Sequence, residues 1–316
     1  MRFTRTVGNA AAVALVGLAL SACGSAAGDS GDSSEKTITV EHAQGTTEVP
    51  VNPDSVLTFD IASLDTMDAL GVDAVTGVPK DALPDYLDKY AGDDYTNIGT
   101  LFEPDYEALP ATEPDLIIVS GRSAAAYEDL SEDFTVIDMS IDSANYAKSL
   151  GERTETLGKI FDEESEAEKM LAGLDDRIAA VKDAAAEKGT GLVLLTSGGE
   201  VTAYGTGSRY DWIHTDFGVQ PAVDNIKHEG HHGEAVSFEF IKEANPDWMF
   251  VIDRDAAIGE AGKSAKQVLD NELVAQTTAW KQDQVVYLDP QAWYIVGGGL
   301  TATSTMIEQF EDAFGL

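Results

Sequence analysis

Cysteine is almost absent from this chain of 316 residues, because Cys23 is the only one. A lone thiol excludes disulfide bonds within the chain and any metal site built from several cysteines. This cysteine lies directly after an apolar N-terminal segment, and its position there bears on the export signal.

Basic residues are also few. The chain has 20 Lys and Arg against 56 Asp and Glu, which gives a net charge of −36. A surface this acidic repels nucleic acid and anionic lipid, so both are excluded as partners. The same charge keeps a protein soluble when it is tethered close to a membrane.

The N-terminus has the composition of an export signal. Arg2 and Arg5 form a basic region, and the apolar segment 7–20 is short for a membrane span. It leads into Leu-Ser-Ala-Cys at residues 20–23, a pattern that resembles a bacterial lipobox.

This pattern predicts a lipoprotein. We expect residues 1–22 to be the signal peptide, Cys23 to carry the lipid, and residues 23–36, which are small and polar, to form a flexible tether. Loss of residues 1–22 removes two arginines and no acid, so the net charge becomes −38. The protein is then expected on the extracytoplasmic face of the cytoplasmic membrane. An ordinary signal peptide with an incidental cysteine is the alternative.

Short apolar runs alternate with helical stretches after residue 37. The runs that indicate buried strands are 56–59, 116–120, 135–138, 192–196, 248–252 and 285–288. Helical segments lie between most of them, which predicts an α/β protein.

The centre of the chain is different. Residues 144–161 and 163–187 are long, charged and helical, with apolar residues at helix spacing. A long helix with α/β units on both sides predicts two Rossmann-like lobes with mainly parallel sheets, bridged by that helix. We expect the lobes at 37–142 and 189–316, with a helical region at 143–188.

A repeat with a spacing of 132 residues supports the two lobes. Each copy has an aromatic residue and Glu, then Pro-Asp beginning seven residues after the Glu, then an apolar strand and an Arg. The paired residues are Glu107 and Glu239, Pro114 and Pro246, and Arg122 and Arg254. We expect each Glu near the start of a surface helix and each Arg at the carboxyl end of a strand, where open α/β sheets bind ligands. Two unrelated helix–strand turns are the alternative.

A third arginine, Arg209, follows a Gly-rich turn and Ser208. Ser208 is a typical helix cap, so Arg209 is expected in the first turn of a helix, where a cation opposes the helix dipole. Something other than the helix itself must then favour a cation at this position. Arg122, Arg209 and Arg254 come from separate segments and can converge on one oxygen-rich anion. A surface ion pair is the alternative for each.

Two adjacent aromatic residues, Trp293 and Tyr294, follow the last apolar strand. At most one of two such neighbours can easily point into a core, so we expect one to face a ligand. Both are candidate ligand-binding residues. A hydrophobic plug on the lobe is the alternative.

Three of the five histidines lie close together, as His228, His231 and His232. They lack the one-turn spacing of a zinc helix, although a zinc site of another geometry stays open. A catalytic base would need a nucleophile, and the sequence has no nucleophile elbow, metallohydrolase or triad signature.

Several segments together carry a family resemblance: VSFEFIKEANPDWMFVIDRDAAIG, GSRYDWIHTDFGV, NIKHEGHHG, SGRSAAAY and LDPQAWYIVGGGL. They resemble the iron-siderophore substrate-binding lipoproteins of ABC importers, which are of the class III periplasmic-binding-protein type. The most similar group binds catecholates of the enterobactin and petrobactin types. The resemblance runs from about residue 38 to the end, and it implies two Rossmann-like lobes bridged by a long helix, with little hinge closure.

The resemblance also implies roles for individual residues. Arg122, Arg209 and Arg254 match an arginine triad that faces the anionic ferric catecholate. His232 and Tyr294 match a pair that ligates the siderophore-bound iron when the siderophore offers only four donors. The additional histidines of this loop, at positions 228 and 231, leave open which imidazole reaches the iron.

The expected function is therefore that of a monomeric, non-enzymatic binding lipoprotein. Its ligand would be a ferric siderophore, carried as cargo without an intrinsic cofactor. Its partner would be an ABC permease of the FecCD type, and Glu107 and Glu239 match the glutamates that dock on permease arginines. A binding protein for bare zinc or manganese, haem or cobalamin is the alternative, and a secreted metallohydrolase that uses the histidine loop is less favoured.

Overall fold

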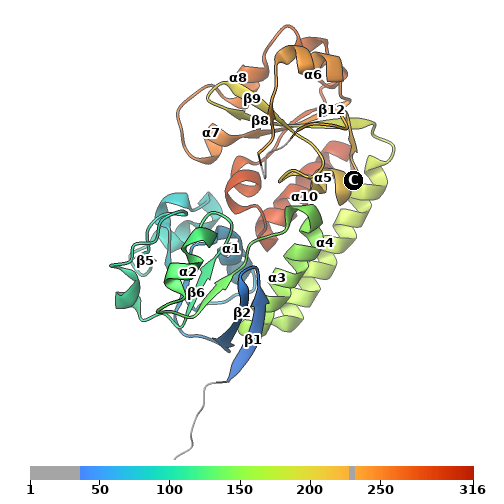
Figure 1. Cartoon of the computed structure of the whole chain (residues 1–316). Helices are drawn as coiled ribbons and strands as arrows, with labels where there is room; N and C mark the ends of the chain where they lie inside the picture. The colour runs from blue at the N-terminus through green and yellow to red at the C-terminus, as the bar shows by residue number, and fades with distance from the viewer. Residues whose placement is uncertain (1–35, 228–231) are drawn as a thin grey trace, which may run out of the picture. The chain divides into compact units, whose positions relative to one another are not determined.

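Apolar runs of the chain form the central strands of two β-sheets (Figure 1). The computed structural model describes residues 36–227 and 232–316. All six expected strands are present: β3 (Val56–Thr58), β6 (Leu116–Val119), β7 (Val136–Asp138), β8 (Thr190–Ser197), β12 (Trp248–Asp253) and β13 (Val285–Tyr287). The sequence pattern therefore locates the centre of each sheet.

The first sheet is parallel throughout, as expected. Its order is β5-β4-β3-β6-β7, and it includes two strands that the sequence pattern did not reveal, β4 (Val75–Val78) and β5 (Thr96–Asn97). An antiparallel hairpin of β1 (Thr37–His42) and β2 (Gly45–Pro50) precedes it and was also not expected.

The second sheet adds antiparallel strands to a parallel centre. Its order is β11-β9-β8-β12-β13, and β10 (Gln220–Pro221) pairs with β8. β12 and β13 run parallel with β8, whereas β9 (Glu200–Tyr204) and β11 (Glu234–Ala235) pair antiparallel. Gly198 and Gly199 reverse the chain between β8 and β9, because both adopt positive φ (58° and 85°) in a two-residue hairpin loop.

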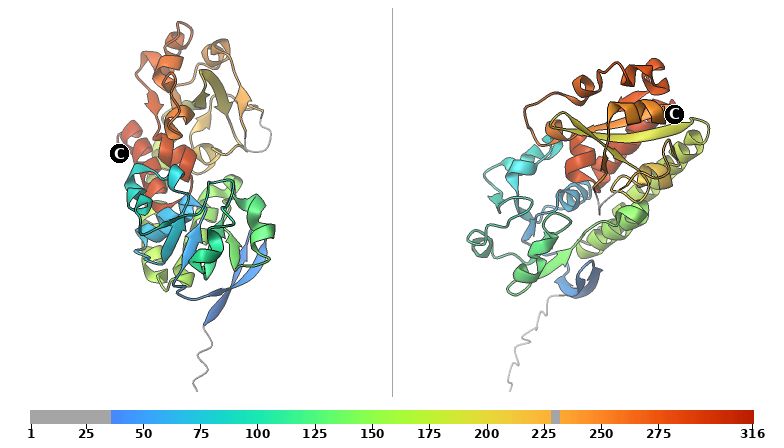
Figure 2. Two further views of the ribbon diagram at one scale, coloured as in Figure 1. Left: turned by 90° about the vertical axis from the view of Figure 1, so that its left-hand side faces the viewer. Right: turned by 45° about the horizontal axis from the view of Figure 1, so that its top comes forward.

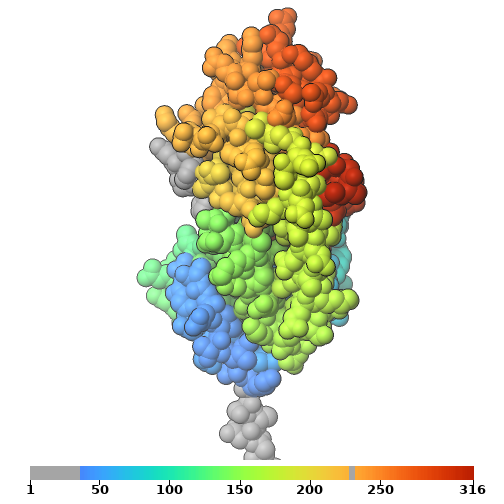
Figure 3. All heavy atoms as spheres, turned by 90° about the vertical axis from the view of Figure 1, so that its right-hand side faces the viewer, coloured from blue at the N-terminus to red at the C-terminus, as the bar shows by residue number. Residues whose placement is uncertain are grey.

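Two long helices connect the sheets. The chain leaves the first sheet at β7 and runs through α3 (Tyr146–Ile160) and α4 (Glu164–Ala185) to β8, within two residues of the expected helical ranges. The 22 residues of α4 extend about 33 Å. α4 packs beside α3, as the right-hand view of Figure 2 shows, and its outer side is at the surface (Figure 3). No helix among the described residues is both long and apolar enough to cross a membrane.

The last helix, α10 (Leu300–Phe314), ties the two halves of the described chain together. It packs against α4 and also against α1 (Ile61–Ala69), which follows β3 of the first sheet. Arg177 of α4 holds it through hydrogen bonds of 2.6 and 2.9 Å to the Glu311 carboxylate. The chain thus returns to the first sheet after completing the second.

The remaining helical segments are short. The α-helices among them are α2 (Tyr127–Leu130), α5 (Trp212–Thr215), α6 (Phe238–Ala244), α7 (Arg254–Ala257), α8 (Ala265–Leu269) and α9 (Thr278–Lys281). The 3-10 segments are η1 (Lys80–Ala82), η2 (Asp85–Ala91), η3 (Leu109–Thr112), η4 (Ala124–Ala126), η5 (Ser143–Asn145) and η6 (Val274–Gln276). A π-helical turn, η7 (Gln291–Val296), precedes α10.

The alternation of side chains along the strands divides the core into one shared and two outer clusters. On β12, Trp248 and Phe250 belong to the shared cluster, whereas Met249 and Val251 belong to the outer cluster of the second sheet. β6 alternates in the same way between the shared cluster and the outer cluster of the first sheet. Both faces of each sheet are therefore covered, which explains why the central strands are continuous apolar runs in the sequence.

The 132-residue repeat has a structural counterpart. Glu113 and Asn245, each directly before a Pro-Asp pair, both adopt a left-handed backbone with φ of 45° and 42°. Asp115 accepts hydrogen bonds from two backbone amides just before β3, and Asp247 accepts one from the amide of Thr190 at the start of β8 (2.8 Å). The same local structure thus precedes both β6 and β12.

Asp65 of α1 lies at the N-terminus of α10. Its side chain is fully buried; Oδ2 accepts a hydrogen bond from the amide of Ala302 (3.0 Å), and Oδ1 has no partner among the described residues. Gly299 permits this approach, because a Cβ there would overlap the carboxylate. Burial raises the pKa of Asp65 from 3.8 to about 6, and the hydrogen bonds from α10 offset this only in part.

This raised pKa predicts a pH-dependent cost to stability. Between about pH 4 and pH 6 folded Asp65 keeps a proton that the unfolded chain has released, so stability falls as the pH rises through this window. The full cost is about 3 kcal/mol at neutral pH. Asp65→Asn keeps an acceptor for α10 without the charge. Its free energy of unfolding in urea, relative to wild type, should therefore rise by about 2–3 kcal/mol from pH 4 to pH 7. Parallel pH profiles for the two proteins would show that Asp65 is ionised at no cost.

Candidate ligand-binding site

A pocket of about 410 Å³ lies at the carboxyl ends of the strands of the first sheet. Phe59 and Asp60 follow β3, and Arg122 follows β6. Arg209 and residues 294–297, which belong to the second half of the chain, complete the lining. Ligands of open α/β sheets bind at such strand ends. We call this space the arginine pocket.

The ring of Tyr294 is surrounded by three arginine side chains. The guanidinium carbons of Arg209, Arg122 and Arg254 lie 4.9, 5.5 and 5.9 Å from its centroid. Nε of Arg254 also donates a hydrogen bond to the phenol oxygen at 3.1 Å. The expected convergence of the three arginines is present in the structure, whereas their role in ligand binding stays a prediction.

Arg122 and Arg209 share their acceptor. Arg122 donates to the carbonyl oxygens of Tyr294 (2.6 Å) and Ile295 (3.1 Å), and Arg209 donates to the same carbonyl of Tyr294 at 3.3 Å. Burial lowers the pKa of Arg122, and the charge of Arg209 lowers it further. Among the described residues neither guanidinium has a carboxylate within ion-pair distance. An anion in the pocket would therefore offset a repulsion that the free protein carries.

Arg254 is placed differently. It begins α7, its side chain is one-third exposed, and its Nη1 lies 3.6 Å from carboxylate oxygens of both Asp255 and Glu260. The hydrogen bond to Tyr294 raises the pKa of Arg254. Partly exposed pairs at this distance contribute little to stability. Arg254 does not line the arginine pocket itself and reaches it only through its contact with Tyr294.

Arg209 precedes a helix instead of occupying its first turn, which corrects its expected position. α5 begins three residues later, at Trp212. Ser208 does not cap it, because its Oγ donates to a carbonyl three residues earlier (2.6 Å) and accepts from the amide of Tyr210 (3.3 Å). The guanidinium lies 5.0 Å from the ring centroid of Tyr210 as well as against Tyr294. Aromatic contact, not a helix terminus, defines the surroundings of this cation.

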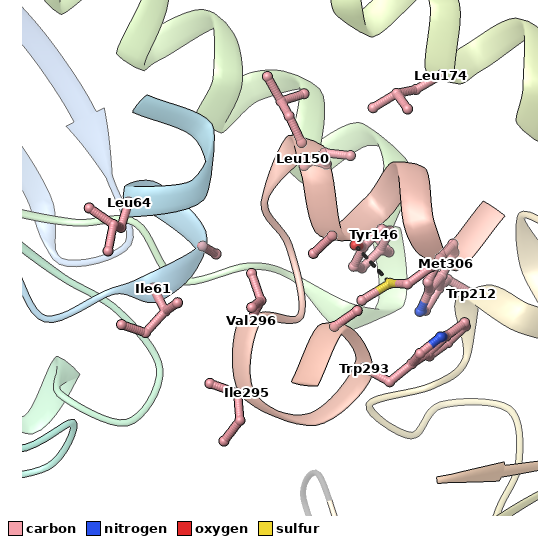
Figure 4. Packing of buried hydrophobic residues seen from close by; sticks show 14 of the residues in the cluster. Ile61, Leu64, Tyr146, Leu150, Leu174, Trp212, Trp293, Ile295, Val296 and Met306 are labelled. Carbon is pink, nitrogen blue, oxygen red and sulfur yellow. Dashed lines mark hydrogen bonds between the residues drawn. The ribbon is translucent and has the colours of Figure 1, made fainter. Parts of the chain in front are cut away.

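The π-helical turn η7 sends Trp293 and Tyr294 to different sides. Tyr294 lines the arginine pocket, whereas Trp293 is 1% exposed and stacks on Trp212 with ring centroids 5.0 Å apart (Figure 4). The indole of Trp293 also donates to Oε1 of Gln309 at 2.9 Å. Trp293 is therefore buried beneath the pocket, and its expected part in ligand binding stays a prediction.

A fourth arginine, Arg153 of α3, reaches the pocket and was not expected from the sequence. Its Nη2 lies 2.5 Å from Oδ2 of Asp60, and both side chains are about one-tenth exposed. Asp60 also caps α1 by accepting a hydrogen bond from the amide of Ser63 (3.0 Å). The pair is neutral as a unit, so it shapes the pocket wall without adding to its charge. No sequence signal joins two residues that are 93 positions apart.

A large part of the chain matches a known family. Residues 56–292, well over half of the chain, match the family described as periplasmic binding protein. The chain belongs to the periplasmic binding protein family.

Several individual periplasmic binding proteins are similar to this one. The petrobactin-binding protein YclQ of Bacillus subtilis is 43% identical, over 95% of this chain and 96% of its own. A crystal structure of that protein superposes with a TM-score of 0.85 and 44% identity, over 89% of this chain and 99% of that one.

Two Vibrio proteins are more distant. The ferric-anguibactin-binding protein FatB of Vibrio anguillarum is 32% identical, over 87% of this chain and 86% of its own. The crystal structure of the periplasmic catecholate-siderophore binding protein VctP of Vibrio cholerae has a TM-score of 0.82 and 33% identity, over 88% of this chain and all of that one. These likenesses confirm the expected fold class.

The two repeat glutamates of this periplasmic binding protein are exposed, as expected. Glu239 lies in the first turn of α6, where the helix dipole favours an acid. Glu107 lies in a turn just before η3, so the first copy has a 3-10 segment where the sequence pattern indicated a helix. Both residues are accessible to a protein partner.

His232 is exposed and does not line the arginine pocket with Tyr294. The next residue, Gly233, packs so closely on β9 that a Cβ would collide with the carbonyl oxygen of Ala203. His228 and His231 lie outside the described residues. In the described parts of the chain no three His, Cys, Asp or Glu residues form a group that could hold a metal ion. The expected pairing of His232 with Tyr294 at iron stays a prediction.

Proposed function

We propose that this chain is a non-enzymatic, monomeric substrate-binding protein that captures a ferric catecholate siderophore and delivers it to an ABC permease of the FecCD type for iron uptake. The observation that carries the proposal is the cluster of Arg122, Arg209 and Arg254 around Tyr294. The similar proteins named as binders of petrobactin, ferric anguibactin and catecholate siderophores support this ligand class. The siderophore and its iron are cargo, with no resident cofactor.

The chemistry of a ferric catecholate fits this arrangement. Three catecholates on one iron(III) ion form a trianion with flat, oxygen-rich faces. Guanidinium groups recognise such surfaces by planar hydrogen bonds and by stacking. Because an aromatic ring and not a carboxylate stands at the centre of the arginine cluster, no acidic side chain there cancels the positive charge.

Capture of bare zinc or manganese fits the arrangement less well. Such ions need three or four protein ligands, and the described residues contain no suitable group. A pocket lined by arginines also repels cations. No feature of the described residues favours haem, cobalamin or a metallohydrolase reaction over the ferric siderophore.

One prediction from this proposal concerns the charge of the pocket. Replacing Arg122, Arg209 or Arg254 with Ala should each weaken binding of an iron(III) tris(catecholate) by about 1–3 kcal/mol, because a charge-assisted contact is lost. Quenching of tryptophan fluorescence can report binding, since Trp212 and Trp293 are buried beside the pocket. Arg177→Ala, on α4 and paired with Glu311, is the matched control and should bind normally.

Neutral ferric hydroxamate complexes should bind poorly to the wild type in the same assay. Equal affinity for charged and neutral complexes would show that the arginine cluster does not select the ligand.

The second prediction concerns the iron itself. Iron(III) prefers six ligands, so a four-donor bis-catecholate leaves two positions, which we propose are filled by Tyr294 and His232. Tyr294→Phe should then abolish a phenolate-to-iron charge-transfer band, and affinity should fall at acid pH because the ligands must be deprotonated. Neither Tyr294→Phe nor His232→Ala should affect a six-donor complex. If the Tyr294→Phe and His232→Ala variants bind the four-donor complex with unchanged spectrum and affinity, Tyr294 and His232 are not iron ligands. If His228→Ala or His231→Ala loses affinity for the four-donor complex instead, the imidazole of that residue is the iron ligand.

The third prediction concerns delivery. We propose that Glu107 and Glu239, exposed at equivalent positions of the repeat, dock on the permease. Glu107→Ala and Glu239→Ala should therefore keep full siderophore affinity in solution while lowering iron uptake by cells. A loss of affinity in purified Glu239→Ala would place that residue in the binding site or the fold.

The same cells test the anchor that we propose at Cys23, outside the described residues. Cys23→Ser should release the protein from the membrane fraction, and retention of the variant there would exclude a lipid on this residue.

A further inference from the structure

A second pocket, of about 400 Å³, adjoins the arginine pocket. Leu101 and Ile295 line both, so the two spaces share a wall. No arginine lines the second pocket: Phe102 and Ile258 contribute large apolar side chains at its edge, and Asp81, Thr100 and Gln291 contribute polar groups, so its wall is polar and apolar in about equal parts. We call this space the second pocket. The sequence pattern gave no indication of it.

Phe102 stands at the tip of a firmly held turn. The phenyl ring is 64% exposed. Its backbone amide donates to Oγ1 of Thr100 (3.2 Å), and a β-bridge joins Gly99 to Pro104 across the base of the turn. Gly99 allows this closure because it adopts φ of 116° and because a Cβ there would collide with the carbonyl oxygen of Glu103. The ring is thus held in water by ordered backbone, and it lies at the edge of the same pocket as Ile258.

Ile258 approaches the same pocket from the second half of the chain. Its side chain is 36% exposed, and its amide closes α7 by donating to the carbonyl of Arg254 (3.1 Å). Arg254 begins this helix and contacts Tyr294, so one short helix serves both spaces. The cation and the apolar side chain are therefore fixed relative to each other.

Ile295 continues the shared wall. It lies on η7 directly after Tyr294, and its carbonyl oxygen accepts a hydrogen bond from Arg122. Figure 4 shows the side chain of Ile295 directed away from Trp293. A molecule lying against Tyr294 in the arginine pocket would therefore meet apolar surface on passing Ile295.

We propose that the second pocket binds the hydrocarbon linker of the siderophore whose iron centre occupies the arginine pocket. This inference rests on the proposed function. A chelator that presents several catecholates must join them by a covalent linker, and that linker extends away from the charged iron centre. Phe102 and Ile258 clasp this part of the ligand from the two halves of the chain. The second pocket then selects among siderophores of equal charge.

The test compares two iron(III) complexes with the same three catechol groups. One is the tris(catecholate) of free catechol, kept in excess, and the other is a six-donor chelator whose catechols are joined by a hydrocarbon linker. Phe102→Ala should weaken binding of the linked complex about tenfold, the effect of losing part of the burial of one phenyl ring, and should change binding of the free-catechol complex less than twofold. Phe102→Leu should restore most of the affinity for the linked complex.

Two controls separate the possible outcomes. Tyr287→Ala removes an aromatic ring that is 37% exposed and lines neither pocket, so it should leave both affinities unchanged. Arg209→Ala should weaken the binding of both complexes to a similar extent, because it removes a positive charge from the arginine pocket.

The results that overturn the proposal are distinct. If Phe102→Ala weakens both complexes equally, Phe102 contacts the iron centre or its catechols, and the linker assignment is wrong. If it changes neither while Arg209→Ala weakens both, the second pocket is not a subsite although the proposed function stands. If the wild type binds neither complex, the proposed function fails, and the subsite fails with it.

Discussion

One turn of backbone, Gln291–Val296, supports both the core and the candidate site. On one side Trp293 stacks on Trp212, which in turn stacks on Tyr146 of α3 at 4.2 Å. On the other side Tyr294 presents its ring to three guanidinium groups, while the carbonyl of the same residue accepts hydrogen bonds from Arg122 and Arg209. The position of the arginine cluster is thus fixed by the same turn that fills the core beneath it.

The choice of a phenol at this point has an electrostatic meaning. A carboxylate in the place of Tyr294 would form ion pairs with the arginines and cancel their charge. An aromatic face contacts guanidinium groups favourably and leaves the charge intact. Arg153 shows the other arrangement in the same pocket, because its charge is already matched by Asp60. The pocket therefore contains both a neutralised arginine that belongs to the fold and two arginines, Arg122 and Arg209, that have no carboxylate partner among the described residues.

The sequence allowed the main features of this structure to be predicted, and the misses have physical causes. Buried central strands and charged long helices have strong periodic patterns, so both were located closely. The repeat pointed to Arg122 and Arg254, and the structure extends it: Asp105 and Ser237, also 132 positions apart, each accept backbone hydrogen bonds at the start of the following turn or helix. The β8–β9 hairpin was missed although Gly198-Gly199 between apolar runs was a usable signal.

Other features had no local signal in the sequence. Which of Trp293 and Tyr294 faces inward depends on Trp212 and Gln309, which are distant along the chain. The second pocket depends on a turn after β5 and on the end of α7, which only the fold brings together. The start of α5 was misplaced because Ser208 is a residue type that often caps helices, but its hydroxyl donates a hydrogen bond to the turn before it.

The arginine cluster is positively charged, whereas the chain as a whole is negatively charged. This contrast has opposite effects on the approach of an anionic ligand and on its retention in the pocket. The net charge of the chain is −36, so an anionic ligand would be repelled at long range, and the arginines of the pocket would attract it only at short range. Dissolved salt screens the long-range repulsion, because the screening length is about 10 Å at 0.1 M, and it affects the desolvated contacts in the pocket much less. For such a ligand a saline medium would speed arrival without a matching loss of retention. The acidic surface would also keep neighbouring copies apart if the protein were held at high density on a membrane.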